Sequence, residues 1–245
     1  MLDNLPTIRV ITLRESADRR DNFVRQINKY TNNYKFIICE RFETSDFSLK
    51  GETLQALHSN SYGPIASHLY NLYDWYNTCQ DDFCIIMEDD VSFETLDYWK
   101  FTLKEFISIL PTNWEAIQLV NVGEGLETPT KIRSRNWNDW CIAAFIVKRS
   151  YAKKVIDQHV IAPNNFCVDL KTSFLPIVEN VILDPSNSNV YIFPLFVEDT
   201  VNCKSTYKGT ELVMYDGQGP LHHDSHEFIL NWWKNNNIDL QRISI

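Results

Sequence analysis

Two hydrophobic periods alternate along the first forty residues. The runs TIRVITL (residues 7–13) and YKFIICE (residues 34–40) are short and rich in β-branched and aromatic residues, which is typical of strands. Between them, Phe23, Ile27 and Tyr30 recur at helical spacing after the polar stretch RESAD. The pattern therefore predicts a strand, a helix and a second strand.

The alternation continues through the middle of the chain. An amphipathic helix is predicted from Ser61 to about Thr78, and FCIIM (residues 83–87) follows at once as a buried strand. The apolar face of this helix is formed by Ile65, Leu69, Leu72 and Tyr76. We expect a further helix near Tyr98–Ile109 and a strand at AIQLVNV (residues 116–122).

The second half begins with WCIAAFIVK (residues 140–148), a nearly continuous apolar run that is typical of a central strand covered on both faces. Ser150 is expected to cap the helix YAKKVIDQ that follows. NVYIFPLFVE (residues 189–198) is predicted as a strand, and the capping-box spacing of Asp224 and Glu227 predicts that a last helix starts at the histidines. Strands that alternate with helices predict an α/β fold with a mixed, mostly parallel sheet flanked by helices.

Composition and charge restrict the class of protein. The 245 residues are 44% hydrophobic and 22% charged, and no linker or repeat divides them, so we expect one globular domain over residues 1–245. The 23 Lys and Arg against 32 Asp and Glu give a net charge of −9, which argues against nucleic acid or anionic lipid as a partner. No signal peptide is visible and no stretch approaches about 18 apolar residues, so we expect no membrane span and a cytoplasmic location.

The six cysteines are scattered through the chain and form no CxxC pair. Several lie within apolar runs such as FCIIM and WCIAAF. We therefore expect buried, reduced thiols rather than a disulfide framework.

The acidic triplet Glu88, Asp89 and Asp90 is the strongest chemical feature of the sequence. It directly follows the buried strand FCIIM, and α/β sheets bind ligands at the carboxyl ends of their strands. Carboxylates held close together repel one another, and a divalent cation such as Mn²⁺ or Mg²⁺ relieves this repulsion and bridges to phosphate oxygens. Taken alone, an acidic turn that merely ends a strand remains the simpler interpretation.

Four segments, in order along the chain, resemble glycosyltransferase family 25, which contains bacterial lipooligosaccharide galactosyltransferases and the collagen hydroxylysine galactosyltransferases. They are VITLRESADRR, YGPIASHLYNLYDWY, CIIMEDDVSFE and WCIAAFIVKRSYAKKVI, and they span roughly the first two-thirds of the sequence. The resemblance implies a Rossmann-like fold of the GT-A type. It also implies metal-dependent transfer of a hexose, galactose or glucose, from a UDP-sugar to a hydroxyl acceptor with inversion. The acceptor would be a glycan or a hydroxylysine-type protein side chain.

The resemblance also assigns roles within the acidic triplet. Glu88 and Asp90 match the residues that hold Mn²⁺ or Mg²⁺, and Asp89 belongs to the same motif on the donor side. The donor-binding part is expected within about residues 1–125, and the acceptor side within about residues 126–245.

Further donor contacts are implied by the first two segments. Arg14, Arg19 and Arg20 match the arginines that follow the first strand and would contact the nucleotide or its phosphates. Alternatively, Arg19 and Arg20 lie on the solvated face of a helix. Gly63 and His68 match the second segment, and for His68 a hydrogen-bonded structural role is as plausible as a ligand contact.

An inverting transferase needs a general base for the acceptor hydroxyl. Asp169 resembles the acidic residue that the family has after its Ala-Lys-Lys helix, and Glu198 and Asp199 at a strand end are the alternatives. His222 or His223 would complete the metal shell, because many GT-A enzymes use a C-terminal histidine there. A polar loop before a helix is the other interpretation of these histidines.

Two functions of other classes stay open. A non-catalytic nucleotide-sugar or glycan-binding module of the same fold would keep the site without turnover. A metal-dependent phosphohydrolase would use the same carboxylates.

Overall fold

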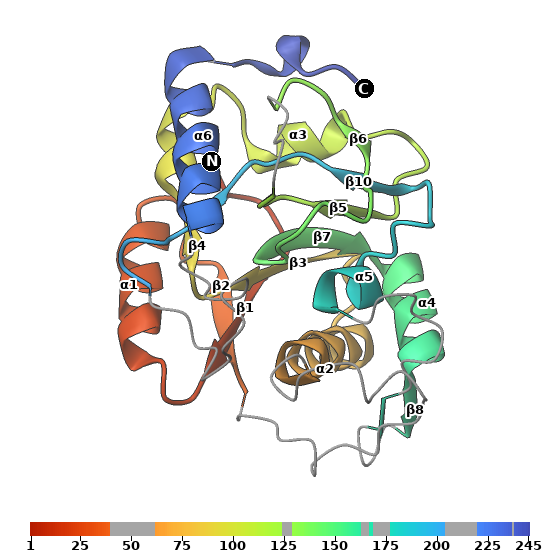
Figure 1. Cartoon of the computed structure of the whole chain (residues 1–245). Helices are drawn as coiled ribbons and strands as arrows, with labels where there is room; N and C mark the ends of the chain where they lie inside the picture. Colours follow the sequence, from red (N-terminus) through yellow and green to blue (C-terminus); the bar gives the residue numbers. More distant parts are fainter. Residues whose placement is uncertain (40–61, 124–128, 163–166, 169–176, 204–219, 237) are drawn as a thin grey trace.

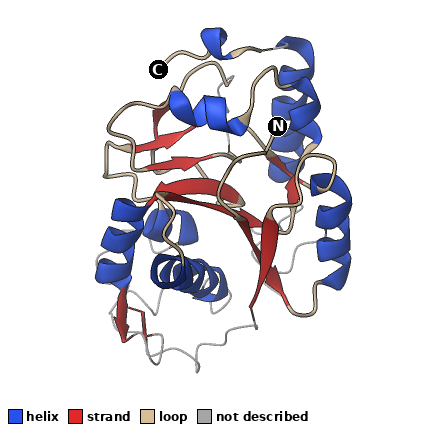
Figure 2. Cartoon of the chain, turned by 180° about the vertical axis from the view of Figure 1, so that it is seen from behind, coloured by secondary structure: helices blue, strands red, loops and turns tan. Residues whose placement is uncertain are grey.

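In the computed structural model, helices cover both faces of a twisted central sheet (Figures 1 and 2). The structure describes residues 1–39, 62–123, 129–162, 167–168, 177–203, 220–236 and 238–245.

The main sheet has seven strands in the order β2-β1-β3-β7-β5-β10-β6. They are β1 (Ile8–Leu13), β2 (Tyr34–Cys39), β3 (Phe83–Glu88), β5 (Ala116–Gln118), β6 (Arg133–Ser134), β7 (Ala144–Lys148) and β10 (Val190–Ile192). β7 is antiparallel to β3 and β5, and β6 is antiparallel to β10, whereas the other neighbouring pairs are parallel. β1, β2, β3, β5 and β10 thus point in one direction, which confirms the predicted α/β fold with a mixed, mostly parallel sheet.

β7 lies at the centre of this sheet, as its apolar sequence predicts. Its residues from Ala144 to Val147 are fully buried. β7 lies between β3 and β5, so the chain segments before and after residue 125 share one sheet.

The helices bury their apolar faces in two clusters, one on each side of the sheet. α1, α3 and α6 contribute to the first cluster, and α2, α4 and α5 contribute to the second (Figure 1). The helices are α1 (Ala17–Ile27), α2 (Tyr62–Thr78), α3 (Leu103–Ser108), α4 (Arg149–His159), α5 (Val178–Ile182) and α6 (Pro220–Asn236). The short elements are β4 (Val91–Ser92), η4 (Glu94–Tyr98), β8 (Val160–Ala162), β9 (Cys167–Val168), β11 (Val197–Glu198) and η6 (Leu240–Arg242).

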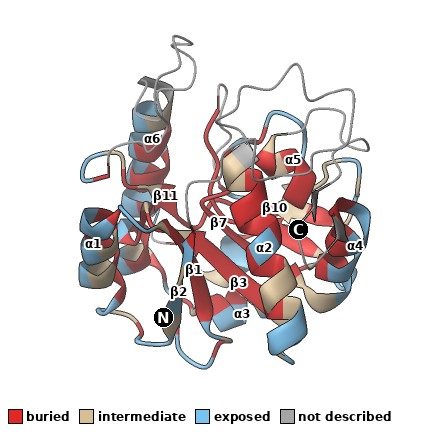
Figure 3. Ribbon diagram, turned by 90° about the horizontal axis from the view of Figure 1, so that it is seen from below, coloured by how far each residue is buried: buried red, intermediate tan, exposed pale blue. Residues whose placement is uncertain are grey.

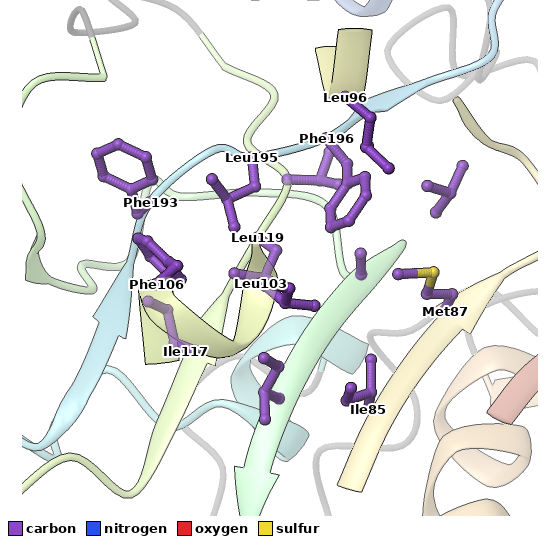
Figure 4. Packing of buried hydrophobic residues seen from close by; sticks show 14 of the residues in the cluster. Ile85, Met87, Leu96, Leu103, Phe106, Ile117, Leu119, Phe193, Leu195 and Phe196 are labelled. Atoms are coloured by element: carbon purple, nitrogen blue, oxygen red, sulfur yellow. The ribbon is translucent and has the colours of Figure 1, made fainter. Parts of the chain in front are cut away.

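Aromatic and aliphatic side chains close the first cluster between the sheet and α3. Phe106 of α3 packs against Phe193, with ring centroids 5.3 Å apart, beside Ile117 and Leu119 (Figure 4). Full burial of a side chain of this kind stabilises a fold by about 1.5–3 kcal/mol. Figure 3 shows that the central strands are buried and that exposed residues lie on the outer surfaces of α1, α2 and α4.

Three predicted helix boundaries are wrong. The helix expected at Tyr98–Ile109 is two elements, because Thr102 caps α3 through a capping box with Glu105. α4 begins directly after β7 with Lys148 at its N-cap position, so Ser150 is not the cap. α6 begins at Pro220, a residue favoured in the first helical position, so the histidines lie inside the helix.

The cysteine side chains in the described part of the chain are free thiols, namely Cys39, Cys79, Cys84, Cys141 and Cys203. All of these except Cys79 are buried, which agrees with the prediction of buried, reduced thiols.

No helix in the described part of the chain has the length and apolarity needed to cross a membrane.

Candidate functional site

The acidic triplet lies at the carboxyl end of β3, next to the central strand of the sheet. Glu88 is the last residue of β3, and Asp89 and Asp90 form the turn into β4. β1, β5 and β10 point the same way as β3, so the carboxyl ends of these strands lie along the same edge. Ligands of open α/β sheets bind at such an edge.

Arg19 of α1 holds the two aspartates of the triplet together. Its Nη2 lies 2.5 Å from Asp89 Oδ1 and 2.6 Å from Asp90 Oδ2. Asp89 Oδ2 also accepts a hydrogen bond of 2.5 Å from Thr12 Oγ1 on β1. The Arg19 side chain is only 8% exposed, so it does not lie on a solvated helix face. Its guanidinium instead supplies a buried positive charge at the turn.

One guanidinium does not neutralise this cluster of carboxylates. Burial raises the pKa of Asp90 to about 8 against the opposing charge of Arg19, and the charges of Glu88, Glu198 and Asp89 add to the rise. Burial likewise raises the pKa of Asp89. Within the described residues, Asp90 Oδ1 is buried and has no hydrogen-bond partner. A further positive charge would therefore stabilise the ionised carboxylates of this site.

Glu88 pairs with His68 of α2. His68 Nε2 lies 2.8 Å from Glu88 Oε1, and the imidazole is fully buried beside the ring of Phe145. Burial alone would raise the pKa of Glu88, but the hydrogen bond and charge of His68, together with Arg19, lower it. His68 is thus a buried, hydrogen-bonded histidine that orients Glu88.

The other residues of the first two segments shape the surroundings of the triplet. Arg20 Nη1 donates to the carbonyl oxygen of Leu13 at 2.5 Å, and its Nη2 donates to that of Arg14 at 3.0 Å. Arg20 therefore stabilises the turn after β1. The Arg14 side chain is exposed in that turn, and Gly63 is the second residue of α2, the helix that bears His68.

β11 brings Glu198 next to the acidic turn. β11 pairs with β4, and the backbone N–H of Asp199 donates to the carbonyl oxygen of Asp90 at 2.6 Å. Glu198 Oε1 accepts a hydrogen bond of 3.1 Å from the Cys141 thiol, and Oε2 pairs with Nδ1 of His222. Its carboxylate is therefore fixed by two neighbours from distant parts of the chain.

Cys141 and Glu179 also belong to this group, although no sequence motif marks either residue as a site residue. The backbone N–H of Cys141 donates to Glu179 Oε1 at 3.0 Å, and Cys141 adopts a φ of 77°, which is rare for a residue other than glycine. Burial raises the pKa of Glu179, and the charge of Glu88 adds to this. Cys141 lies in an apolar run and Glu179 in a five-residue helix, so no spacing pattern links them.

The two candidate histidines lie in different surroundings. Burial alone would lower the pKa of His222, but its hydrogen bond to Glu198 and the charge of that carboxylate raise it. His223 is half exposed, with Nε2 3.4 Å from Glu227 Oε1 on the same helix. The structure thus brings His222 to Glu198 and directs His223 toward solvent.

The remaining candidate bases differ as well. Both carboxylate oxygens of Asp199 accept hydrogen bonds, and the donors are Asn22, Gln26 and Asn202. Asp199 therefore joins α1 to the segment after β11. Asp169 lies outside the described residues.

The predicted metal ligands do not form a ready-made shell. Among the described residues, no three His, Cys, Asp or Glu side chains are arranged to hold a metal ion. Glu88, Asp90, His222 and His223 each pair with a different residue, as given above. The donor set nevertheless fits a hard divalent cation, because it offers carboxylate oxygens, excess negative charge and the unpartnered Oδ1 of Asp90.

Comparisons with known proteins add a structural context. No protein-family model matches the chain, and a search of curated proteins finds no match. The chain is similar to the crystal structure of a glycosyltransferase involved in the glycosylation of the major capsid of PBCV-1, with 12% identity and a TM-score of 0.41 over 77% of this chain and 82% of that one. It is also similar to the glycosyltransferase GlyE of Streptococcus pneumoniae TIGR4, with 10% identity and a TM-score of 0.36 over 94% of this chain and 64% of that one. Because the sequence identities and TM-scores are this low, evidence for the function comes from the residues of the chain itself.

Proposed function

We propose that the chain is a metal-dependent glycosyltransferase of the GT-A type that moves a hexose, galactose or glucose, from a UDP-sugar to a hydroxyl acceptor. The main support is the acidic turn of Glu88, Asp89 and Asp90, which combines a sheet edge suited to ligands with a buried excess of negative charge. The four segments that resemble family 25 add to this support.

In this proposal, the residues of the acidic turn have separate tasks. Glu88 and Asp90 would hold Mn²⁺ or Mg²⁺, which supplies Lewis-acid stabilisation of the departing diphosphate. His68 keeps Glu88 ionised and oriented. Arg19, between Asp89 and Asp90, offers its guanidinium to the diphosphate oxygens.

We assign the general base to Glu198. In an inverting transfer the base takes the proton of the acceptor hydroxyl while UDP leaves. Glu198 is suited to this because Cys141 and His222 fix its carboxylate next to the acidic turn. Asp199 is less suited, because five hydrogen bonds from Asn22, Gln26 and Asn202 fill its two oxygens and lower its pKa, whereas each Glu198 oxygen has one such partner. Asp169, expected from the resemblance, is the alternative base.

The proposal is tested by incubating the protein with Mn²⁺ and a panel of nucleotide sugars. We expect release of UDP from UDP-galactose or UDP-glucose, loss of that release with a chelator, and a rise in the melting temperature that requires both metal and nucleotide. The absence of binding and turnover across the whole panel would refute the proposal.

One observation favours a non-catalytic binding module instead. Asp89 and Asp90 are already paired with a buried arginine, as a purely structural acidic turn would be. Such a module would bind UDP-sugars in the thermal assay without releasing UDP. Release of free phosphate rather than sugar transfer would indicate a phosphohydrolase.

A further inference from the structure

A cavity of about 410 Å³ opens at the carboxyl ends of β5 and β10. Asn121 follows β5, Ile192 ends β10, and Pro194 follows it, whereas Lys131 and Arg133 come from the segment that enters β6. β5 and β10 point the same way as β3, so this cavity lies along the same edge of the sheet as the acidic turn. A volume of this size is typical of small-molecule sites.

Two backbone contacts connect the wall of this cavity with the group around Glu198. Val122, next to Asn121, forms an isolated bridge with Trp140, the neighbour of Cys141. The N–H of Gly123 donates to Ser225 Oγ of α6, the helix that also bears His222, at 3.5 Å. These contacts join the segment that bears Asn121 to the segments that bear Cys141 and His222.

Asn121 lines the cavity, and its side chain has one hydrogen-bond acceptor that the described residues leave unused. Its side chain is nine-tenths buried, and Nδ2 donates to Asp139 Oδ1 at 3.3 Å. Oδ1 is buried and has no hydrogen-bond partner within the described residues. Buried acceptors are normally paired, and one without a donor is unfavourable. A ligand hydroxyl next to Asn121 would supply the missing donor.

Of the two basic residues in the cavity wall, Arg133 has an acidic partner and Lys131 has none in the described part of the chain. Arg133 is neutralised by Asp139, since its Nη1 and Nη2 lie 2.7 and 2.6 Å from the two carboxylate oxygens. Lys131 is exposed and forms no ion pair in the described part of the chain. Among the described residues, Lys131 is thus the cation of the wall without an acidic partner, although the whole chain has a net charge of −9. This arrangement favours an anionic group in the ligand.

Three further wall residues are apolar, and Thr130 adds a polar side chain. Ile192, Pro194 and Pro129 present aliphatic C–H groups, which pack against the apolar face of a sugar ring. We propose that this cavity binds a sugar unit with a negative charge, a carboxylate or a phosphate, and that this unit is part of the acceptor. The acceptor assignment rests on the proposed glycosyltransferase function, whereas the binding of an acidic sugar does not.

Binding is measured on the full chain without any donor, by calorimetry or ligand-detected NMR. The probes are glucuronic acid, glucose 6-phosphate, glucose and inorganic phosphate. We expect the two anionic sugars to bind about three- to tenfold more tightly than glucose, and inorganic phosphate to bind more weakly than either. Lys131→Gln should remove the preference for the anionic sugars without changing the melting temperature, because Lys131 is exposed.

Lys29→Gln is the matched control, since Lys29 is also exposed but follows α1 at the opposite edge of the sheet. Asn121→Ala should weaken all three sugars and leave inorganic phosphate unaffected. Equal binding of glucose and the anionic sugars, or an equal effect of Lys131→Gln and Lys29→Gln, would overturn the inference. Phosphate that binds as tightly as glucose 6-phosphate would also overturn it, because the site would then recognise the anion alone.

The two proposals can fail separately. If UDP is released from a UDP-sugar but acidic sugars do not bind, the transferase proposal stands and the proposed acceptor site is refuted. Binding of acidic sugars that Lys131→Gln abolishes, with no UDP release across the donor panel, would leave a carbohydrate site on a protein that is not a transferase.

Discussion

Replacing Asp74 by asparagine removes the charged partner of a buried arginine beneath the site. Arg9 of β1 is 1% exposed, its Nη2 lies 2.5 Å from Asp74 Oδ2 on α2, and its Nε donates to Asn71. A guanidinium stays protonated in proteins, so Asp74→Asn leaves a buried charge with neutral partners. The pair also fixes α2, and with it His68, against β1.

The size of the effect follows from the exposure of the two partners. Breaking a fully buried ion pair costs about 3–5 kcal/mol. Asp74 is 33% exposed and water replaces part of the interaction, so we expect Asp74→Asn to lower the free energy of unfolding by about 2–3 kcal/mol. The matched control is Asp157→Asn, which breaks a pair with Lys153 whose side chains are 55% and 60% exposed. That change should cost less than about 0.5 kcal/mol.

The assay is urea unfolding followed by tryptophan fluorescence, with the midpoint and slope compared among the three proteins. Equal losses for Asp74→Asn and Asp157→Asn, at unchanged slope, would refute the reasoning that burial of Arg9 sets the cost. A loss confined to Asp74→Asn supports it.

Three further predictions concern the group around Glu198. Glu198→Gln should lower the rate of UDP release by about 10²–10⁴-fold while thermal stabilisation by UDP and Mn²⁺ persists; loss of binding instead would contradict its role as base. Cys141→Ser, which keeps a donor for Glu198, should retain more of that rate than Cys141→Ala, and equal rates would exclude a role of the thiol. Burial alone would raise the pKa of Asp199, but its hydrogen bonds from amides lower it. The ionised carboxylate therefore stabilises the fold fully above the ordinary pKa of 3.8, and this contribution is lost as pH falls through the lowered pKa. The difference in free energy of unfolding between wild type and Asp199→Asn should therefore shrink below about pH 4 in urea titrations, and a constant difference would contradict this.

The sequence predicts the sheet and the acidic turn well, because both depend on local patterns. The apolar run that becomes β7 is long enough to need cover on both faces, and β7 is the central strand. FCIIM delivers the triplet to the end of a buried strand, and Glu88 ends β3. In both cases, hydrophobic periodicity alone decides where the residues lie.

The partners of the triplet depend on contacts that no local pattern contains. The sequence leaves open whether Arg19 contacts a donor or lies on a solvated helix face, and only the docking of α1 beside the turn buries it between two aspartates. The bridge from Cys141 to Glu179 and Glu198 joins three segments and needs a left-handed backbone at a cysteine. The capping-box spacing at Asp224 predicts a start of α6 that is too late, because Pro220 already begins the helix.

Replacement of Asp90 by asparagine tests whether the acidic turn performs metal-dependent sugar transfer. Asparagine has nearly the same shape, Asp89 still pairs with Arg19, and burial already raises the pKa of Asp90 to about 8, so the fold should persist. The measurement is UDP release in the presence of Mn²⁺ and a UDP-sugar, with the melting temperature as a control for folding. We predict that Asp90→Asn lowers the rate at least about a hundredfold without lowering the melting temperature. A rate within about twofold of the wild type, at equal metal concentration, would exclude a role of Asp90 in metal-dependent transfer.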